Sequence, residues 1–263
     1  MEYRERILRF IEEIKTSCLP SVSMDFVVFG FHEGQLKVLL LKWQGVDTWM
    51  LPGGRVRMDE NMEDAAYRSL RERTGLAEVF LQQFHTFGNV IRNTYYAMEE
   101  TRTKLGFSAE DFEGLPHRDI SVGFYALVEY TKVNPTPGLE LALDPFTEQI
   151  QWCNVEEVPQ LLFDHNEMIQ VALKTLRRQL SYQPIGYTLL PDQFTMPQLQ
   201  QLYETILGQR LDRRNFQKRM LSYGILERGE KFQNGGAYKA PYLYRFDREK
   251  YQQALAEERL LVV

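Results

Sequence analysis

Cysteine is scarce in this chain, and long apolar runs are missing. Only Cys18 and Cys153 occur among the 263 residues, too few for a disulfide framework or a cysteine-based zinc site. We expect both to be core residues of a protein from a reducing compartment. No stretch approaches the roughly 20 apolar residues of a membrane helix. The charged start MEYRERILRFIEEIK favours an amphipathic helix over a signal peptide. We therefore expect a cytoplasmic protein without membrane contact.

Histidine is also rare, with four residues in all. His32, His85 and His117 do not have the spacing of a zinc site. His165 lies where we expect a helix to begin, so we interpret it as a cap or an interdomain contact. The histidines thus suggest neither a metal ion nor a resident cofactor.

Positive charge is in the minority, but it is unevenly distributed. The whole chain has 31 Lys and Arg against 36 Asp and Glu, a net charge of −5. From Tyr187 onward there are 12 cations against 9 anions, a local charge of +3, and the preceding part carries 19 against 27, a local charge of −8. Such asymmetry is a weak indication that a nucleic-acid-binding module follows an acidic domain.

The hydrophobic pattern predicts two domains. Strands and helices alternate in the first part of the chain, where we expect a hairpin from Ser23–Phe31 and Leu36–Trp43. The other expected elements of this part are a helix over 1–15, strands over 49–54, 79–86, 121–129 and 149–154, and helices over 60–74 and 163–182. Beyond Pro184 the pattern predicts two helices, 197–207 and 213–222, and then strands near 225–228 and 242–246. We place the boundary between residues 183 and 184, giving domains 1–183 and 184–263.

Residues 54–76 carry the clearest motif. They read GRVRMDENMEDAAYRSLRERTGL and resemble the Nudix box, in which Gly and Glu precede Arg-Glu-aliphatic-x-Glu-Glu-x-Gly-aliphatic at fixed spacings. The positions that match are Gly54, Glu60, Arg68, Leu70, Glu72, Gly75 and Leu76, and the preceding WMLPG also fits. The resemblance implies the Nudix fold, an α/β/α sandwich.

Two residues of this motif depart from the pattern. In the family, three glutamates at i, i+3 and i+4 share one helix face and hold a magnesium ion that grips a diphosphate. Here those positions are Ser69, Glu72 and Arg73, and an arginine repels a metal ion. We therefore predict no catalytic residues and no metal. Arg68 and Glu72 are then interpreted as an i, i+4 ion pair, although a residual nucleoside diphosphate hydrolase stays open as the alternative.

The second part of the chain has the order of a helix-turn-helix with a wing, an arrangement that fits the major groove of DNA. Its second helix follows Asp212, a good N-cap, and contains four cations within two turns. Two amide side chains there can pair bidentately with adenine, and a lysine of the wing suits phosphate. The candidate DNA-binding residues are Arg213, Arg214, Asn215, Gln217, Lys218, Arg219 and Lys239. The alternatives are a small helical domain with a solvated charged face and a protein-binding adaptor.

Together the two parts resemble the Nudix-related transcriptional regulators. The segments LLPDQFT, LQQLYETILG and LDRRNFQKRML look like the winged helix of that family, and RDISV like one of its central strands. The resemblance implies a homodimeric bacterial repressor that binds a palindromic operator. It also implies a small-molecule effector, either an ADP-ribose-like nucleotide or a pentose sugar.

We expect the effector to bind near the Nudix box and to shift the two wings of the dimer relative to one another, which lowers DNA affinity. Backbone N–H groups of the Gly-Gly turn and the helix start could hold a phosphate or sugar. The candidate effector-binding residues are Gly53, Gly54, Arg55, Arg68, Glu72 and Arg118. One departure from the family is a long segment between Gly88 and Arg118, whose residues include Tyr95, Tyr96 and Phe107. It is either a peripheral decoration or a lid over the ligand.

Overall fold

The structure is a computed structural model of the whole chain. It describes residues 2–44, 46–77, 79–90, 102–104, 106–115, 118–132, 147–180, 187–232 and 240–256. The chain divides into two compact units, one formed by residues 1–29, 37–126 and 131–172, and the other by residues 30–36, 127–130 and 173–263. The domain boundary expected between residues 183 and 184, the wing residue Lys239, and Tyr95, Tyr96 and His117 lie outside the described residues.

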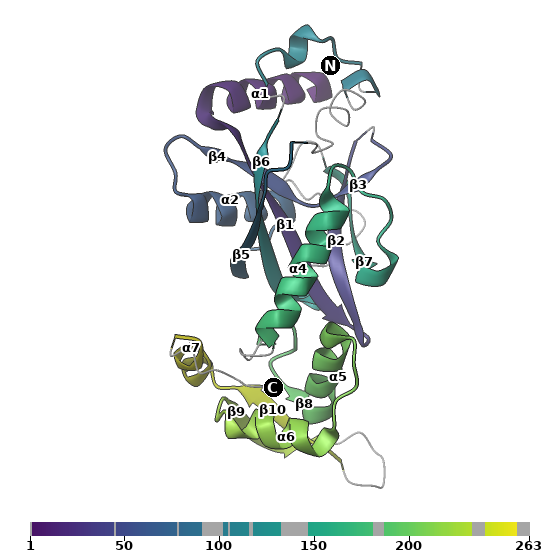
Figure 1. The fold of residues 1–263 in the computed structure, drawn as a ribbon, viewed down its shortest axis with the longest axis vertical. Helices are drawn as coiled ribbons and strands as arrows, with labels where there is room; N and C mark the ends of the chain where they lie inside the picture. The colour runs from purple at the N-terminus through teal and green to yellow at the C-terminus, as the bar shows by residue number, and fades with distance from the viewer. Residues whose placement is uncertain are drawn as a thin grey trace. The chain divides into compact units, whose positions relative to one another are not determined.

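The first unit is built on a seven-stranded sheet (Figure 1). Its path is β3-β2-β1-β6-β5, with β4 pairing with β1 and β7 pairing with β2. The strands are β1 (Cys18–His32), β2 (Gln35–Trp43), β3 (Trp49–Met50), β4 (Gly53–Arg57), β5 (Phe80–Phe87), β6 (Ile120–Glu129) and β7 (Thr147–Asn154). The helices of this part of the chain are α1 (Glu2–Ser17), α2 (Met62–Thr74) and α4 (His165–Leu180), which begins in the first unit and continues into the second. The short 3-10 turns are η1 (Glu110–Phe112), η2 (Tyr130–Lys132) and η3 (Val155–Glu157).

The expected hairpin is confirmed, because β1 and β2 are neighbours in the sheet and their connection is tight. Glu33 and Gly34 both have positive φ, 49° and 76°, as a type I′ hairpin turn requires. The expected strand over 49–54 is wrong as a single element. It is split at Leu51 and Pro52, where β3 pairs with β2 and β4 pairs with β1, so the chain changes its strand partner at this point.

The core of the sheet comes from long apolar runs in its central strands. Phe26, Val27, Val28 and Phe29 of β1 are fully buried, as expected for a strand covered on both faces. Helix α2 packs against β4 through buried Ala65, Ala66 and Leu70. It begins at Met62, two residues later than expected, and Gly75 ends it with a φ of 76°, the left-handed conformation that favours glycine.

The second unit contains a three-stranded sheet and the two expected helices. The order of its strands is β8-β10-β9, from β8 (Phe194–Thr195), β9 (Leu226–Lys231) and β10 (Tyr242–Phe246). Helices α5 (Met196–Leu207) and α6 (Arg213–Ser222) precede the β9–β10 ribbon, and α7 (Arg248–Ala256) follows it. This is a winged helix-turn-helix, as expected. The two-residue strand β8 and helix α7 were not expected from the sequence.

Candidate functional site

Arg68 of α2 is the centre of a hydrogen-bonded cluster in the box. It donates to both carboxylate oxygens of Glu60, to Glu72 at 2.9 Å and to the backbone carbonyl of Arg55 at 2.8 Å. Glu60 also accepts a bond of 2.7 Å from the backbone N–H of Arg57. The side chains of Arg68 and Glu60 are only 17% and 14% exposed. The expected Arg68–Glu72 pair is therefore present, and it belongs to a network that ties the loop before α2 to the helix.

This network shifts the titration of its members. The guanidinium of Arg68 donates hydrogen bonds to Glu60, and this holds the pKa of Glu60 below its usual value although burial opposes the shift. The same bonds raise the pKa of Arg68. Both groups therefore stay charged over the physiological range, and two of the motif's carboxylates, Glu60 and Glu72, are engaged by a cation.

Replacing Glu60 by glutamine is expected to destabilise the protein by about 2 kcal/mol at pH 7, because a charge-assisted hydrogen bond becomes a neutral one. A carboxylate whose folded pKa is depressed contributes stability above its unfolded pKa and loses it as the pH falls through the folded pKa. The difference between the wild type and Glu60→Gln should therefore shrink below about pH 4. Urea unfolding at several pH values measures it, and a difference that does not change with pH would contradict the assignment.

Ser69 and Arg73 occupy the other two positions of the motif. The Ser69 hydroxyl is buried and has no hydrogen-bond partner among the described residues. It lies against Gly54, where a Cβ atom would come within 2.3 Å of the oxygen, so the glycine is needed for this close packing. Arg73 donates to the carbonyl of Gly53 at 3.0 Å and lies over the ring of Phe10 at 5.5 Å. No three His, Cys, Asp or Glu side chains of the described residues are grouped so that they could hold a metal ion.

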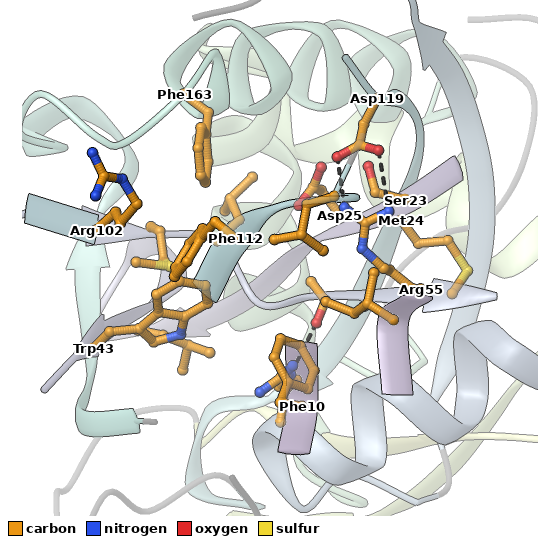
Figure 2. A pocket seen from close by; sticks show the side chains of 18 of the residues that line it. Phe10, Ser23, Met24, Asp25, Trp43, Arg55, Arg102, Phe112, Asp119 and Phe163 are labelled. Atoms are coloured by element: carbon orange, nitrogen blue, oxygen red, sulfur yellow. Dashed lines mark hydrogen bonds and ion pairs between the residues drawn. The ribbon is translucent and has the colours of Figure 1, made fainter. Parts of the chain in front are cut away.

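A cavity of about 530 Å³ opens beside the β3–β4 turn (Figure 2). We call it the aromatic cavity, because Phe10, Trp43, Phe112 and Phe163 contribute to its lining together with apolar residues of β1, β2 and β3. Its volume lies within the range of small-molecule sites in proteins, about 300–1,000 Å³. Three of the expected effector-binding residues, Gly53, Gly54 and Arg55, line it.

The floor of the aromatic cavity carries a buried polar cluster. Asp25 of β1 accepts a hydrogen bond from the Ser121 hydroxyl of β6, and its other oxygen lies 3.4 Å from Nε2 of His165. Nδ1 of His165 accepts the backbone N–H of Leu51 at 2.9 Å. Because Nδ1 accepts, the proton of a neutral His165 lies on Nε2 and points at Asp25. His165, expected at a helix start, is indeed the first residue of α4, and it joins α4 to the β3–β4 turn.

A second cavity of about 380 Å³ is lined by charged residues of α1, β4 and α2. We call it the arginine cavity. It shares Phe10, Ile14, Gly54, Arg55 and Arg73 with the aromatic cavity, so the two are contiguous at that point. The charged residues that line it are Arg6, Arg9, Glu13, Arg55, Arg57, Arg68, Glu72 and Arg73. Arg55 forms a bidentate pair with Asp119, at 3.1 and 2.7 Å, and Arg68 is paired with Glu60 and Glu72. The six arginines still outnumber these carboxylates, so the lining keeps a net positive charge.

The structure thus brings five of the expected effector-binding residues together. Gly53, Gly54 and Arg55 line the aromatic cavity, and Arg68 and Glu72 line the arginine cavity. Arg118 is not among the described residues that line either cavity, and its guanidinium donates to the carbonyl of Gly88. The sequence analysis did not propose Asp25, Ser121 or Asp119 as site residues, since single polar residues within or next to strands carry no local signal of a site.

Helix α6 carries six of the seven expected DNA-binding residues. Asp212 caps it by accepting the backbone N–H of Asn215 at 2.9 Å, and Phe216 and Met220 are buried against the unit. This leaves the other face of the helix to its polar side chains. Arg213, Arg214, Asn215 and Lys218 are exposed, and Gln217 and Arg219 are half-buried. Arg219 donates to the hydroxyl of Tyr223, so it is held closer to the domain than the other three cations.

Comparison with family models agrees with both units. The NUDIX domain model matches residues 21–172, and the NrtR DNA-binding winged helix domain model matches residues 186–246. The chain belongs to the Nudix family. It combines a Nudix domain with a winged helix, and both cavities described above are lined by residues of the Nudix domain together with residues of α1, which precedes the matched range.

Three relatives extend over nearly the whole protein. The ADPR responsive transcriptional repressor NtrR of Acinetobacter baylyi is 28% identical over 251 residues, covering 92% of this chain and 89% of that protein. NrtR of Shewanella oneidensis complexed with a 27mer DNA has a TM-score of 0.64 and 25% identity, covering 88% of this chain and 95% of that one. A MutT/nudix family protein from Enterococcus faecalis has a TM-score of 0.58 and 20% identity over 87% of both chains, a likeness of fold. Within the described residues no helix is long and apolar enough to span a bilayer.

Proposed function

We propose that this Nudix-family protein is a transcriptional repressor that binds an operator through α6 and is released by an ADP-ribose-like nucleotide. The observation that carries the proposal is the pairing, in one chain, of a ligand-sized cavity in the Nudix domain with an exposed cationic helix in a winged helix. A relative that is 28% identical over 92% of this chain and 89% of its own length is named an ADPR responsive transcriptional repressor. The domain limits 1–183 and 184–263 are part of this proposal.

The DNA-binding role rests on the exposed side chains of α6. Arg213, Arg214 and Lys218 supply positive charge for phosphates, and Asn215 and Gln217 supply amides for base edges. Lys239 of the wing is a further candidate. A winged helix of this size reads a short half-site, so we infer a homodimer on a palindromic operator. DNA as the partner also implies a cytoplasmic protein.

The effector is inferred from the chemistry of the two cavities. The aromatic cavity offers rings and apolar side chains, whereas the arginine cavity offers guanidinium groups that suit phosphate. A nucleotide with a diphosphate has both kinds of group in one molecule. A pentose has neither a large apolar face nor a charge, so these cavities favour the ADP-ribose-like nucleotide over the sugar. Gly53, Gly54, Arg55, Arg68 and Glu72 would surround it. Arg118, which lines neither cavity among the described residues, stays a prediction.

We further infer that the Nudix domain binds its ligand without hydrolysing it. Magnesium prefers several oxygen ligands in near-octahedral geometry. Glu60 and Glu72 are paired with Arg68, Ser69 offers one buried hydroxyl, and Arg73 places a cation at the third position of the motif. These residues do not fit a magnesium ion, so no catalytic step is derived through one. A nucleoside diphosphate hydrolase is the alternative.

Fluorescence anisotropy with labelled palindromes from the DNA upstream of the gene tests the proposal. We expect salt-sensitive binding, because phosphate contacts release counterions. Added ADP-ribose should weaken binding by about tenfold or more, a usual size for allosteric coupling, and arabinose should not. Release of phosphate products from ADP-ribose with magnesium would favour the hydrolase instead. Failure to bind any DNA, with no turnover, would favour a protein-binding adaptor.

A further inference from the structure

Three aromatic rings, which come from distant parts of the chain, line one end of the aromatic cavity. Trp43 ends β2, Phe112 lies in η1 of the long segment between Gly88 and Arg118, and Phe163 lies just before α4. Figure 2 shows the side chains of Trp43 and Phe112 together, with Phe163 directed toward them from the opposite side. All three are half-buried, so each has a ring surface that a ligand can cover.

Phe163 is held in a conformation that its own residue type disfavours. Its φ is 58°, a left-handed value that an aromatic residue adopts at a cost. The ring lies edge-on to His165, with 5.2 Å between the ring centres, and His165 is fixed by Leu51 and Asp25. Strained residues that persist at cavities are characteristic of ligand-binding sites. The backbone strain therefore points to a role for the ring that packing alone does not require.

The segment that carries Phe112 is packed on α1. Phe107 is buried with Ile7 and Ile11 of α1 in one cluster, and Phe112 packs against it. Arg4 of α1 is paired with Asp111 at 3.1 Å, and the rings of Phe107 and Phe112 are 5.7 Å apart. Several described residues of the segment also line the aromatic cavity. The described part of this segment is therefore part of the cavity wall and not a peripheral decoration.

We propose that Trp43, Phe112 and Phe163 form a stacking subsite that binds the planar aromatic base of the effector. Residues 106–115, which pack on α1, would cover this subsite. The faces of aromatic side chains bind flat π-systems, and such stacking tolerates any base. The cationic part of the site begins at Arg55 and Arg73, where the two cavities meet, so a base in the subsite would leave its phosphates near the arginines. The proposal rests on the proposed function.

Calorimetric titration of the full-length protein tests the subsite with two matched ligands. AMP carries an adenine base at C1 of the sugar, where ribose 5-phosphate has only a hydroxyl. Phe112→Ala should lower the affinity for AMP and for ADP-ribose by about tenfold, within the range measured for one stacked base, and leave ribose 5-phosphate unchanged. Tyr67→Ala is the control, since Tyr67 is an exposed aromatic on α2 that is not among the residues lining either cavity. Equal affinities for AMP in the wild type and Phe112→Ala would overturn the subsite.

A second variant separates loss of the ring from loss of the fold. Phe163→Gly relieves the left-handed strain, so its melting temperature should match or exceed that of Phe163→Ala. Its affinity for AMP should nevertheless fall about tenfold, as in Phe163→Ala. An unchanged affinity for AMP in both variants would overturn the proposal.

The proposed function can fail independently of the subsite. If AMP and ADP-ribose bind as expected but do not release DNA, the stacking subsite stands and the repressor mechanism fails. If the wild type binds DNA and binds AMP no more tightly than ribose 5-phosphate, the stacking subsite is wrong. That result would indicate an effector without an aromatic base.

Discussion

The double variant Arg213→Glu with Arg214→Glu is expected to lower operator affinity by about a thousandfold or more at physiological salt. Both side chains are exposed in the first turn of α6, where they can reach phosphates or base edges. Replacing two cations by anions removes two attractive contacts and introduces repulsion from the phosphate backbone. The slope of log K against log salt should also fall by about two, roughly one for each lost phosphate contact.

A matched control keeps the change in net charge and moves it elsewhere. Arg71 of α2 and Lys174 of α4 are exposed and lie outside the winged helix. The double variant Arg71→Glu with Lys174→Glu changes the net charge by the same amount as the α6 variant. Anisotropy titrations at several salt concentrations compare the two. If both variants lose affinity equally, binding depends on net charge alone and α6 is not the recognition helix.

Replacing Asp25 by alanine is expected to destabilise the Nudix domain by about 3–4 kcal/mol. Asp25 is the acceptor for Ser121 and faces Nε2 of His165, and both of these partners are buried. Without Asp25, two buried polar groups lose a partner, and each costs about 1–3 kcal/mol. Denaturant unfolding monitored by tryptophan fluorescence measures the loss.

Ser121→Ala is the control for this prediction, because it removes one donor and leaves Asp25 facing His165. Its cost should be about 1 kcal/mol, well below that of Asp25→Ala. Similar losses in the two variants would show that the His165 contact contributes little.

Both variants should also be titrated with ADP-ribose, since Asp25 and His165 line the aromatic cavity. A large loss of affinity only in Asp25→Ala would assign the cluster a role in shaping the cavity floor.

Elements with strong local signals could be predicted from the sequence. The Asp212 cap and the glycine at 208, which has a φ of 70°, define two helices of the winged helix, because capping depends on neighbouring residues. The Arg68–Glu72 pair was predictable for the same reason, since i and i+4 meet on any helix. The family motif also predicted the Nudix fold.

Elements that depend on distant partners were not predictable. β8 has two residues and exists because it pairs with β10. Helix α7 carries Tyr251, whose ring contacts those of Tyr187 and Phe246, and contacts between such distant residues follow no sequence period. The expected strand over 49–54 failed because its two halves pair with different strands, which no local pattern encodes.

The sequence alone determined the two domains, the loss of two motif carboxylates and the cationic character of α6, because each depends on residue type at fixed local spacing. Only the tertiary structure decided which distant side chains meet in the buried polar cluster and in the aromatic cavity. Asp25 and Ser121 are 96 residues apart in the chain, and Trp43, Phe112 and Phe163 come from three separate segments. These residues meet only when the sheet pairs and α1 and α4 pack on it, since side chains so distant in sequence share no local geometry.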